Sequence, residues 1–373
     1  MPESSDSVSE SVCRVWKPTR CSISSRTRSA SITAVTRPTI SAGRGSGWVR
    51  VPNATKTPAM RFIMPRVYRA NPFLHSPMKQ HPGQILRDSM DRGPVAAPGA
   101  FNGLVARAVA QAGFKACYLS GGAISAAAGV PDVGILSLDR FVMALREVVL
   151  GSGLPVIADA DTGFGEEEMV RRTVIEYNAA GAAGLHIEDQ VFPKRCGHLA
   201  GKQLIPVEQA LGRLAWAVEA AQDCSDGRFI VCARTDARSV EGLNGTIERA
   251  HAYAEAGAAM IFPEGLESEE EFATVAQKLG SLCSNPPYLL ANMTEFGKTP
   301  IIPFKRFGEL GYHIVIFPVS TLRTAMGAIT AMLTNLKASG SVSHSLESMQ
   351  SRADLYAMLG YEPQGGGWKY PTG

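Results

Sequence analysis

The 373-residue chain lacks several features that would place it in a specialised class. No run approaches about 18 consecutive apolar residues, which excludes a membrane-spanning helix. The seven cysteines are scattered, odd in number and without a CxxC pair, which argues against a disulfide framework and for a reducing compartment. Hydrophobic residues make up 45% and charged residues 19% of the chain, so collagen-like, coiled-coil and wholly disordered classes are excluded.

Acidic residues are also absent between Glu10 and Asp88. Residues 1–77 hold 12 Lys and Arg against three acids, whereas the remainder of the chain holds 25 basic and 31 acidic residues. This basic segment is rich in Ser, Thr and Pro and has no sustained apolar periodicity, so it buries too little apolar surface to offset the entropy of ordering. We therefore expect a disordered basic extension over 1–77 and a catalytic domain over 78–373.

The role of the extension is open from the sequence. Its Arg-rich and Ser-rich composition is typical of an organelle targeting segment, although its acidic opening fits one poorly. A basic arm can also attract nucleic acid, but aromatic residues are sparse, so a nucleic-acid partner is disfavoured. The third alternative is a functionless tail or a start assigned too early, with Met60, Met64 or Met78 as the true first residue.

From about residue 80 onward, short apolar runs alternate with amphipathic helical stretches. Ser137 lies where an N-cap is expected, and Gly181 and Gly257 follow helical patterns. Near-continuous apolar strands between helices indicate parallel pairing covered on both faces, and eight of them predict an α/β fold, a (β/α)₈ TIM-type barrel. The eight expected strands are Val95–Phe101, Ala116–Gly122, Leu154–Ala160, Ala183–Ile187, Arg228–Ala233, Ala259–Pro263, Tyr288–Met293 and His313–Pro318. Expected helices include Asp139–Leu150, Glu166–Ala180 and Thr246–Ala256.

A doubly wound open sheet is the alternative fold. It requires a glycine-rich phosphate turn after the first strand, and the sequence APGAF at 97–101 is not one. Strand after strand instead ends in polar residues, such as those at 118–122, 159–161, 186–189 and 234–236. Because a barrel gathers all carboxyl strand ends at one rim, where its active site lies, this pattern favours the barrel.

Asp159 and Asp161 are the candidate metal ligands. Side chains two residues apart on a strand point to the same face, so both carboxylates can meet one cation. Hard oxygen ligands at a barrel mouth suit Mg²⁺ or, alternatively, Mn²⁺. Glu188 and Glu264 could complete the ligand set, whereas the plainer interpretation is that Asp161 only caps the next helix.

A dense ionisable cluster, KRCGH, occupies 194–198 in the long connection after the fourth strand. Its glycines predict a mobile lid, and loops that close over substrate often carry catalytic groups. The neighbouring cations favour the thiolate of Cys196, which suits a group that donates or accepts a proton. Three alternatives remain: zinc binding with His198, a covalent nucleophile, and an inert surface thiol.

Two further features suit an anionic small molecule. The SGG sequence at 120–122 offers backbone amides unshielded by side chains, although it is equally typical of a tight turn. Arg234, Arg323 and Arg352 are candidate carboxylate clamps, since a guanidinium binds a carboxylate in two places. Metal, arginines and a thiol acid together favour cleavage beside a carboxylate, where an enolate-like dianion must be stabilised.

Seven motifs in one order resemble the isocitrate lyase and phosphoenolpyruvate mutase superfamily and, within it, the methylisocitrate lyases. The resemblance runs from about Gly83 to Tyr361. Its motifs are YLSGG (118–122), DADTGFG (159–165), GLHIEDQ (184–190), KRCGH (194–198), ARTDA (233–237), FPE (262–264) and ANMTEFGKTP (291–300).

The resemblance implies a barrel whose last helix is exchanged between subunits of a homotetramer. It also implies Mg²⁺-dependent cleavage of 2-methylisocitrate to pyruvate and succinate, a step of propionate catabolism in the methylcitrate cycle. Such an enzyme would be cytoplasmic, or would lie in the mitochondrial matrix if 1–77 is a targeting segment. Dimethylmalate lyase and isocitrate lyase are the alternatives, because one methyl group changes selectivity by only about 1–3 kcal/mol. Phosphonopyruvate hydrolases and phosphoenolpyruvate mutases are more remote, since they lack the lid cysteine.

The resemblance further implies roles for single residues. Cys196 would protonate the departing succinate, flanked on the lid by Lys194 and His198. Tyr118 and Glu188 would belong to the proton-transfer and metal-shell groups, and Asp159 and Asp161 would bind the metal. The implied substrate contacts are Ser120, Gly121, Gly122, Cys196, Gly197, Arg234, Glu264, Asn292, Met293, Thr294, Arg323 and Arg352.

Overall fold

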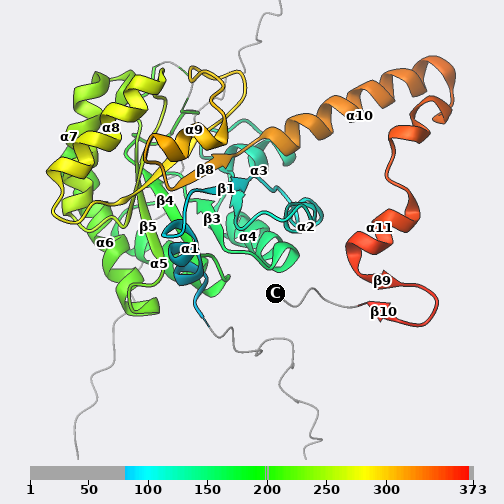
Figure 1. Ribbon diagram of the computed structural model, residues 1–373, viewed down its shortest axis with the longest axis horizontal. Helices are drawn as coiled ribbons and strands as arrows, with labels where there is room; N and C mark the ends of the chain where they lie inside the picture. Colours follow the sequence, from blue (N-terminus) through cyan, green and yellow to red (C-terminus); the bar gives the residue numbers. More distant parts are fainter. Residues whose placement is uncertain (1–79, 198, 200, 369–373) are drawn as a thin grey trace, which may run out of the picture. The chain divides into compact units, whose positions relative to one another are not determined.

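Eight parallel strands form a closed barrel, as the alternation of apolar runs predicts (Figure 1). The computed structural model describes residues 80–197, 199 and 201–368, so the predicted extension over 1–77 lies outside the described residues. The sheet order is β1-β8-β7-β6-β5-β4-β3-β2, and the ring closes where the Ala100 amide donates to the Tyr118 carbonyl at 2.8 Å. The strands are β1 (Val95–Pro98), β2 (Cys117–Leu119), β3 (Val156–Asp159), β4 (Gly184–Glu188), β5 (Ile230–Thr235), β6 (Met260–Pro263), β7 (Tyr288–Asn292) and β8 (Ile314–Phe317).

Helices follow the strands and cover the outside of the barrel (Figure 1). The predicted helices are confirmed as α4, α5 and α7, and Gly181 and Gly257 follow helices with positive φ of 90° and 99°. Ser137 is the N-cap of α4, but its side chain makes no capping hydrogen bond. The helices up to the eighth strand are α1 (Pro82–Met90), α2 (Gly103–Gln111), α3 (Gly121–Ala127), α4 (Leu138–Ser152), α5 (Glu167–Ala179), α6 (Val207–Ser225), η2 (Ala237–Ser239), α7 (Gly242–Glu255), α8 (Glu269–Leu282) and α9 (Phe304–Glu309).

The barrel interior is filled by alternate strand residues, and α1 seals its amino-terminal end. Leu86 and Met90 of α1 belong to the same buried cluster as Ile157, Ile230 and the other inward-facing strand residues. At Gly83, a Cβ would lie only 2.1 Å from the Arg228 carbonyl oxygen, so α1 touches the backbone directly before β5. Because side chains fill the barrel interior and α1 closes its amino-terminal end, a ligand enters at the opposite end, the carboxyl rim.

A second buried cluster lies between the strands and the outer helices. Its aromatic part joins α8 and α9: the ring of Phe272 meets Phe307 edge-on at 5.1 Å and Tyr312 at 5.2 Å between ring centroids. Tyr177 of α5 reaches the strand directly, since its hydroxyl donates to the Asp159 carbonyl at 2.8 Å. The outer core therefore fixes the strand end that carries Asp159.

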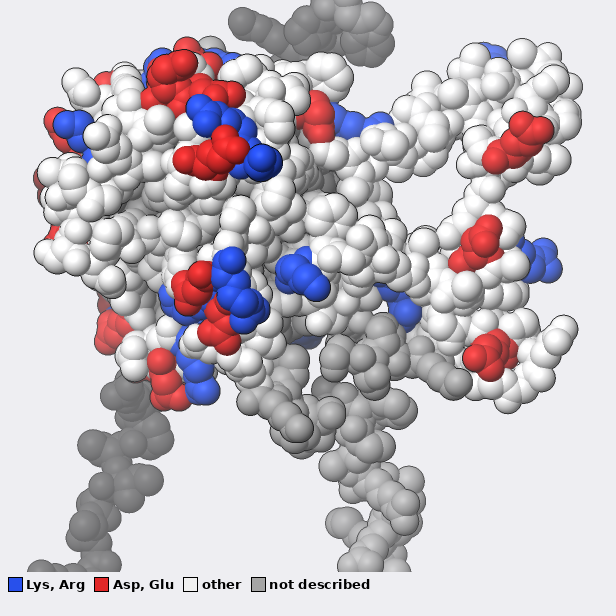
Figure 2. Space-filling model, in the orientation of Figure 1, with Lys and Arg blue, Asp and Glu red and all other residues white. Residues whose placement is uncertain are grey.

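The chain after β8 forms α10 (Ser320–Ser339), η3 (Ser343–Ser348), α11 (Arg352–Leu359) and a short hairpin of β9 (Tyr361–Glu362) and β10 (Gly367–Trp368). Helix α10 contains no buried residue, and its visible face in Figure 2 carries few charges. Helix α11 is anchored to α2, because Arg107 donates to the Met358 and Leu359 carbonyls. None of the helices in the described part of the chain combines the length and apolarity needed to cross a membrane.

Substitution of Phe272 by Ala tests the outer core. Phe272 is 2% exposed and packs on two aromatic rings, so the Phe272→Ala variant should lose about 3–5 kcal/mol of unfolding free energy in urea denaturation. The matched control is Phe114→Ala, where the side chain is 38% exposed and the loss should stay below about 1 kcal/mol. Equal losses in the two variants would contradict this account of the core.

Candidate active site

Polar side chains from the carboxyl ends of the strands surround a cavity of about 260 Å³. Helix α10 closes part of its wall through Arg323, and the loop after β4 contributes Lys194, Cys196 and Gly197. The structure thus brings together twelve residues that the sequence singled out: Tyr118, Ser120, Gly122, Asp159, Lys194, Cys196, Gly197, Arg234, Glu264, Asn292, Thr294 and Arg323.

Three other predicted residues lie directly behind this wall. Asp161 and Glu188 are buried at 4% and 2% exposure and contact the wall residues Lys194 and Arg234. The amide of Gly121 donates to Asp159 Oδ2 at 3.1 Å, so this N–H positions a carboxylate of the site rather than facing the cavity.

The remaining predicted residues lie elsewhere. Met293 is buried, and its sulfur accepts a hydrogen bond from the Ile302 amide at 3.3 Å. Arg352 is exposed at the start of α11 and does not line the cavity of its own chain. His198 lies outside the described residues.

An acidic cluster surrounds the ammonium of Lys194. Lys194 Nζ lies 2.8 Å from Asp161 Oδ1 and forms a short hydrogen bond with Asp132. Burial opposes the charge of Lys194, but the carboxylates of Glu188, Asp161, Asp159 and Asp132 outweigh burial and raise the pKa of the ammonium. This lysine therefore stays charged, and its stem holds the lid against the acidic cluster.

The same crowding disfavours the charged form of two of the acids. Burial, and then the charge of Asp159, raise the pKa of Asp161 to about 7. Burial also raises the pKa of Glu188 well above its usual range, and neither of its carboxylate oxygens has a hydrogen-bond partner in the described part of the chain. Buried carboxylates without donors are costly, and an all-oxygen donor set at this position fits a hard divalent cation.

Arg234 of β5 is the centre of a second charge network. Its Nε lies 2.9 Å from Asp236 Oδ2 and 3.3 Å from Glu188 Oε2, and its terminal nitrogen lies 3.8 Å from Glu264 Oε2. Although burial opposes the charge, these carboxylates raise the pKa of Arg234 well above its usual value. Asn292 donates to Glu264 Oε2 at 3.1 Å, which extends the network across to β7.

A tyrosine–histidine pair lies on the barrel floor of the site. The Tyr118 hydroxyl and His186 Nε2 are 2.7 Å apart, and His186 Nδ1 lies 3.7 Å from Asp159 Oδ1. Burial lowers the pKa of His186 to about 4 and raises the pKa of Tyr118 well above its usual value. Both side chains are therefore neutral at physiological pH and can orient a proton without carrying charge.

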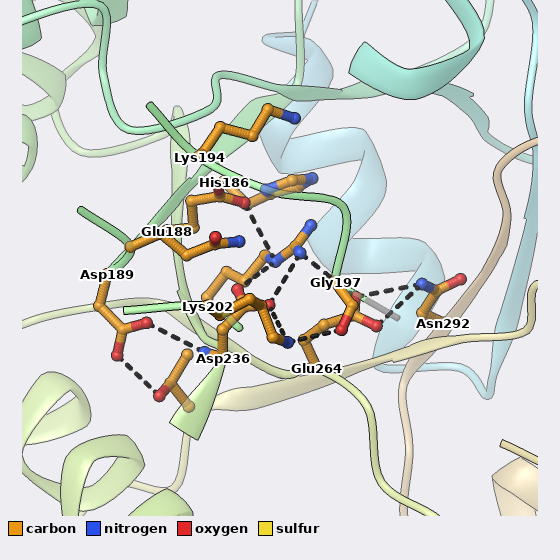
Figure 3. A network of polar contacts seen from close by, with 12 residues as sticks. His186, Glu188, Asp189, Lys194, Gly197, Lys202, Asp236, Glu264 and Asn292 are labelled. Carbon is orange, nitrogen blue, oxygen red and sulfur yellow. Dashed lines mark hydrogen bonds and ion pairs between the residues drawn. The ribbon is translucent and has the colours of Figure 1, made fainter. Parts of the chain in front are cut away.

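The predicted lid is pinned in place by specific contacts. At Gly197, a Cβ would lie 2.6 Å from both an Arg234 nitrogen and Glu264 Cγ, so only glycine permits this close approach of the lid to the strand ends. Lys202 donates to the Gly197 carbonyl at 2.5 Å and to Asp236 at 2.7 Å (Figure 3). The Gln190 side chain bonds both the amide and the carbonyl of Arg195.

Sequence reasoning gave no role to four residues that the structure places in this site: Asp132, His186, Lys202 and Asp236. His186 and Asp236 lie in the polar stretches 186–189 and 234–236 at predicted strand ends, and that position was a signal for both. Lys202 follows Gly201 of the predicted lid, so it could have been predicted to bring a cation to the site in the same way as Lys194. Asp132 had no signal, because it approaches Lys194 from a loop 62 residues earlier in the chain.

Comparison with known proteins agrees with this geometry. Residues 86–337 match the family model described as phosphoenolpyruvate phosphomutase. The chain is 46% identical over 265 residues to a probable 2-methylisocitrate lyase 1 of Corynebacterium glutamicum, which covers 71% of this chain and 84% of the relative. It is 44% identical over 290 residues to a 2-methylisocitrate lyase of Aeropyrum pernix, which covers 78% and 91%. A crystal structure of 2,3-dimethylmalate lyase superposes with a TM-score of 0.70 at 36% identity, covering 75% of this chain and 92% of that structure's chain.

Replacement of Lys202 by Met tests the lid contacts. The variant loses the hydrogen bonds to Gly197 and Asp236, each worth about 1.5–3 kcal/mol when one partner is charged, so the lid should open about ten-fold or more often. We expect trypsin to cleave after Arg195 correspondingly faster, as measured by mass spectrometry of the fragments. The control is Lys278→Met at an exposed position on α8, which should leave the cleavage rate unchanged. An unchanged rate in Lys202→Met would show that Lys202 does not hold the lid.

Proposed function

Because the chain belongs to the phosphoenolpyruvate phosphomutase family and is a lyase of the superfamily that includes isocitrate lyase, we propose that it cleaves 2-methylisocitrate to pyruvate and succinate. The observation that carries the proposal is the position of Cys196: it lines a cavity that also holds cations and an acidic cluster. A thiol in that place can protonate a carbanion that forms beside a carboxylate. The names of the relatives support the substrate.

The cavity wall suits a substrate with several carboxylates. Lys194, Arg234 and Arg323 each contribute a cation to the lining, and Asn292 and Thr294 contribute neutral polar groups. Arg323 lies 3.7 Å from Glu295 and stacks on Phe296, so its guanidinium is oriented by the loop after β7. We propose that these residues grip the substrate carboxylates and hold the bond to be broken under Cys196.

The proposed cleavage breaks the bond between the hydroxyl-bearing carbon and its carboxylate-bearing neighbour. The hydroxyl proton passes to an ionised carboxylate of the acidic cluster at the rim. The oxygen then forms the carbonyl of pyruvate, and the electron pair of the broken bond moves to the neighbouring carbon as a succinate carbanion. Cys196 gives its proton to that carbon, so proton and electron pair are both accounted for.

We also propose that Asp159, Asp161 and Glu188 hold Mg²⁺, or alternatively Mn²⁺. The oxygens of Glu188, which accept no hydrogen bond from a described residue, and the raised pKa of Asp161 support a cation at this position. When bound, such an ion supplies a Lewis acid that stabilises the developing negative charge on the substrate oxygens. The tie between Asp159 and the Gly121 amide keeps one ligand oxygen oriented toward the rim.

A second candidate substrate has specific support. The match to the solved structure of 2,3-dimethylmalate lyase covers 92% of that protein's chain. In addition, one methylene group changes the selectivity of a binding pocket by only about 1–3 kcal/mol. Isocitrate is the third candidate, and phosphonopyruvate chemistry is more remote because Cys196 lines the cavity.

The exposed apolar stripe of α10 supports a homotetramer in which this helix packs on a neighbouring subunit. Met326, Ile329, Leu333 and Leu336 share one helix face and are all at least 36% exposed. Apolar stripes of this kind normally lie against a partner surface. We further propose a reducing compartment, since every described cysteine is a free thiol.

A steady-state assay of the full chain and of its 78–373 fragment tests the substrate and the acid. With Mg²⁺ present, 2-methylisocitrate should give pyruvate with a higher kcat/KM than 2,3-dimethylmalate or isocitrate. Cys196→Ser should lower kcat by about 10²–10⁴-fold, the usual contribution of general acid catalysis. Chelation should abolish turnover, and added Mg²⁺ should restore it.

The matched control is Cys224→Ser, a partly buried thiol outside the cavity, which should retain full activity. A higher kcat/KM with dimethylmalate would overturn the substrate proposal but leave the lyase chemistry in place. Full activity in Cys196→Ser would overturn the role of the thiol as acid.

Substitution on α10 tests the assembly. Leu333→Glu places a charge in the apolar stripe, so we expect it to shift the chain from a tetramer to a smaller species in size-exclusion chromatography with light scattering. Asn335→Glu, on another face of the same helix, should leave the mass unchanged. A wild-type monomer, or identical masses for both variants, would refute an interface at this stripe.

A further inference from the structure

Three potential metal ligands meet on the outer helices, away from the cavity. His251 and Glu255 belong to α7, and Cys283 is the residue at which α8 ends. One ligand atom from each residue lies within 4.8 Å of the other two. The group combines an imidazole, a carboxylate and a thiol, a donor set that the lyase chemistry does not use.

The local sequence explains why these three side chains coincide. His251 and Glu255 are four residues apart, so they lie on the same face of α7 one turn from each other. Cys283 leaves the helical conformation, with φ of −86° and ψ of 133°, which directs the chain out of α8 beside that face. Helices α7 and α8 are neighbours on the barrel surface (Figure 1).

The group lies at the end of the barrel opposite the cavity. Each outer helix runs back from the carboxyl rim, so the last turn of α7 and the end of α8 lie near the beginnings of β6 and β7. None of the residues that line the cavity belongs to α7 or α8. A ligand bound here is therefore separate from the cation proposed for the lyase reaction.

None of the three side chains makes a hydrogen bond or an ion pair with any other described residue. Their neighbours on α7 behave differently: Arg249 bonds Glu241 on two nitrogens, and the Tyr253 hydroxyl bonds Asp189 at 2.9 Å. Cys283 is buried at 6% exposure, whereas Glu255 is exposed, so the group has a buried sulfur end and an open carboxylate end. A cation can reach it from solvent.

We propose that His251, Glu255 and Cys283 form a second metal site, which takes a zinc-class divalent cation. Imidazole nitrogen and thiolate sulfur are the ligands that Zn²⁺ prefers, while Mg²⁺ takes oxygen ligands and would not compete here. Three protein ligands leave a fourth tetrahedral position for water at the open end.

Small side-chain rotations complete the geometry. Ligand atoms about 2.0–2.3 Å from a tetrahedral zinc lie roughly 3.3–3.8 Å apart, and the observed separations of up to 4.8 Å need only partial closure. His251 and Glu255 lie near the end of α7 and are not buried, so they can rotate with little disturbance, whereas Cys283 belongs to the buried core and stays fixed. The metal would then tie the end of α7 to the end of α8.

The protonation state of the Cys283 thiol depends on whether a metal is bound. Burial, and then the negative charge of Glu255, raise the pKa of Cys283, so without a metal the sulfur stays protonated. A bound divalent cation reverses this preference, because a coordinated thiol is deprotonated. The negative charge of Glu255, which opposes a bare thiolate, then becomes a second anionic ligand.

Cobalt titration tests the site, because Co²⁺ substitutes for Zn²⁺ and reports a sulfur ligand by thiolate-to-metal charge-transfer absorption in the near ultraviolet. The full chain, stripped with chelator and held in excess Mg²⁺ to fill the lyase site, should develop this band with one equivalent of Co²⁺. Added Zn²⁺ should displace the cobalt. Cys283→Ser should lose the band entirely, while Cys196→Ser and Cys224→Ser should retain it.

His251→Ala provides a variant that keeps the sulfur and should weaken Co²⁺ binding at least ten-fold. If circular dichroism shows that Cys283→Ser does not fold, His251→Ala still tests whether these residues bind the metal. Lyase activity should be unchanged in both folded variants, because the site lies at the other end of the barrel. Absence of the band in the wild-type chain, its loss in Cys196→Ser, or unaltered affinity in His251→Ala would each overturn the proposal.

Discussion

The rim of this barrel depends on the compensation of buried negative charge. Six acids are buried around the strand ends: Asp159, Asp161, Glu188, Asp189, Asp236 and Glu264. The buried cations that face them are Lys194, Lys202, Arg234 and Arg249, so the buried acids outnumber these cations by two. Uncompensated buried charge is expensive, so the site must bind a cation, protonate an acid, or do both in turn.

That deficit links the fold to the chemistry. Lys194 and Lys202 both belong to the lid loop, and each reaches an acid fixed on a strand or an earlier loop. In the position that the structure shows, the predicted lid therefore brings two positive charges to the acids of the rim. The same contacts that hold Cys196 at the cavity thus help to offset the burial of the acidic cluster.

The sequence was a good guide wherever the signal was local. Strand periodicity located all eight strands to within a few residues, because an apolar run between two helices has few other solutions in a parallel barrel. The polar strand ends predicted which side chains would share the rim. The contacts that depend on three-dimensional packing were out of reach: Asp132 meets Lys194 across 62 residues, and α1 seals the barrel through contacts with strand backbones that no periodicity encodes. Arg352 shows where the resemblance to a family was not sufficient. The resemblance assigned this residue to the substrate, but in the structure of the single chain it lies on the exposed helix α11.

The two ends of the barrel obey different constraints, and this explains where further chemistry can arise. At the carboxyl rim the buried acids and cations are engaged in charge networks that share residues, so a change at one position disturbs the others. At the amino end α1 fills the barrel mouth with apolar side chains, and the outer helix ends carry no part of that network. A donor set such as that of His251, Glu255 and Cys283 can therefore form or vanish there without cost to catalysis. Additional ligand sites in this fold are therefore best sought at such helix ends. There the packing of neighbouring helices brings ligand side chains together, and the charged residues of the rim do not contact them.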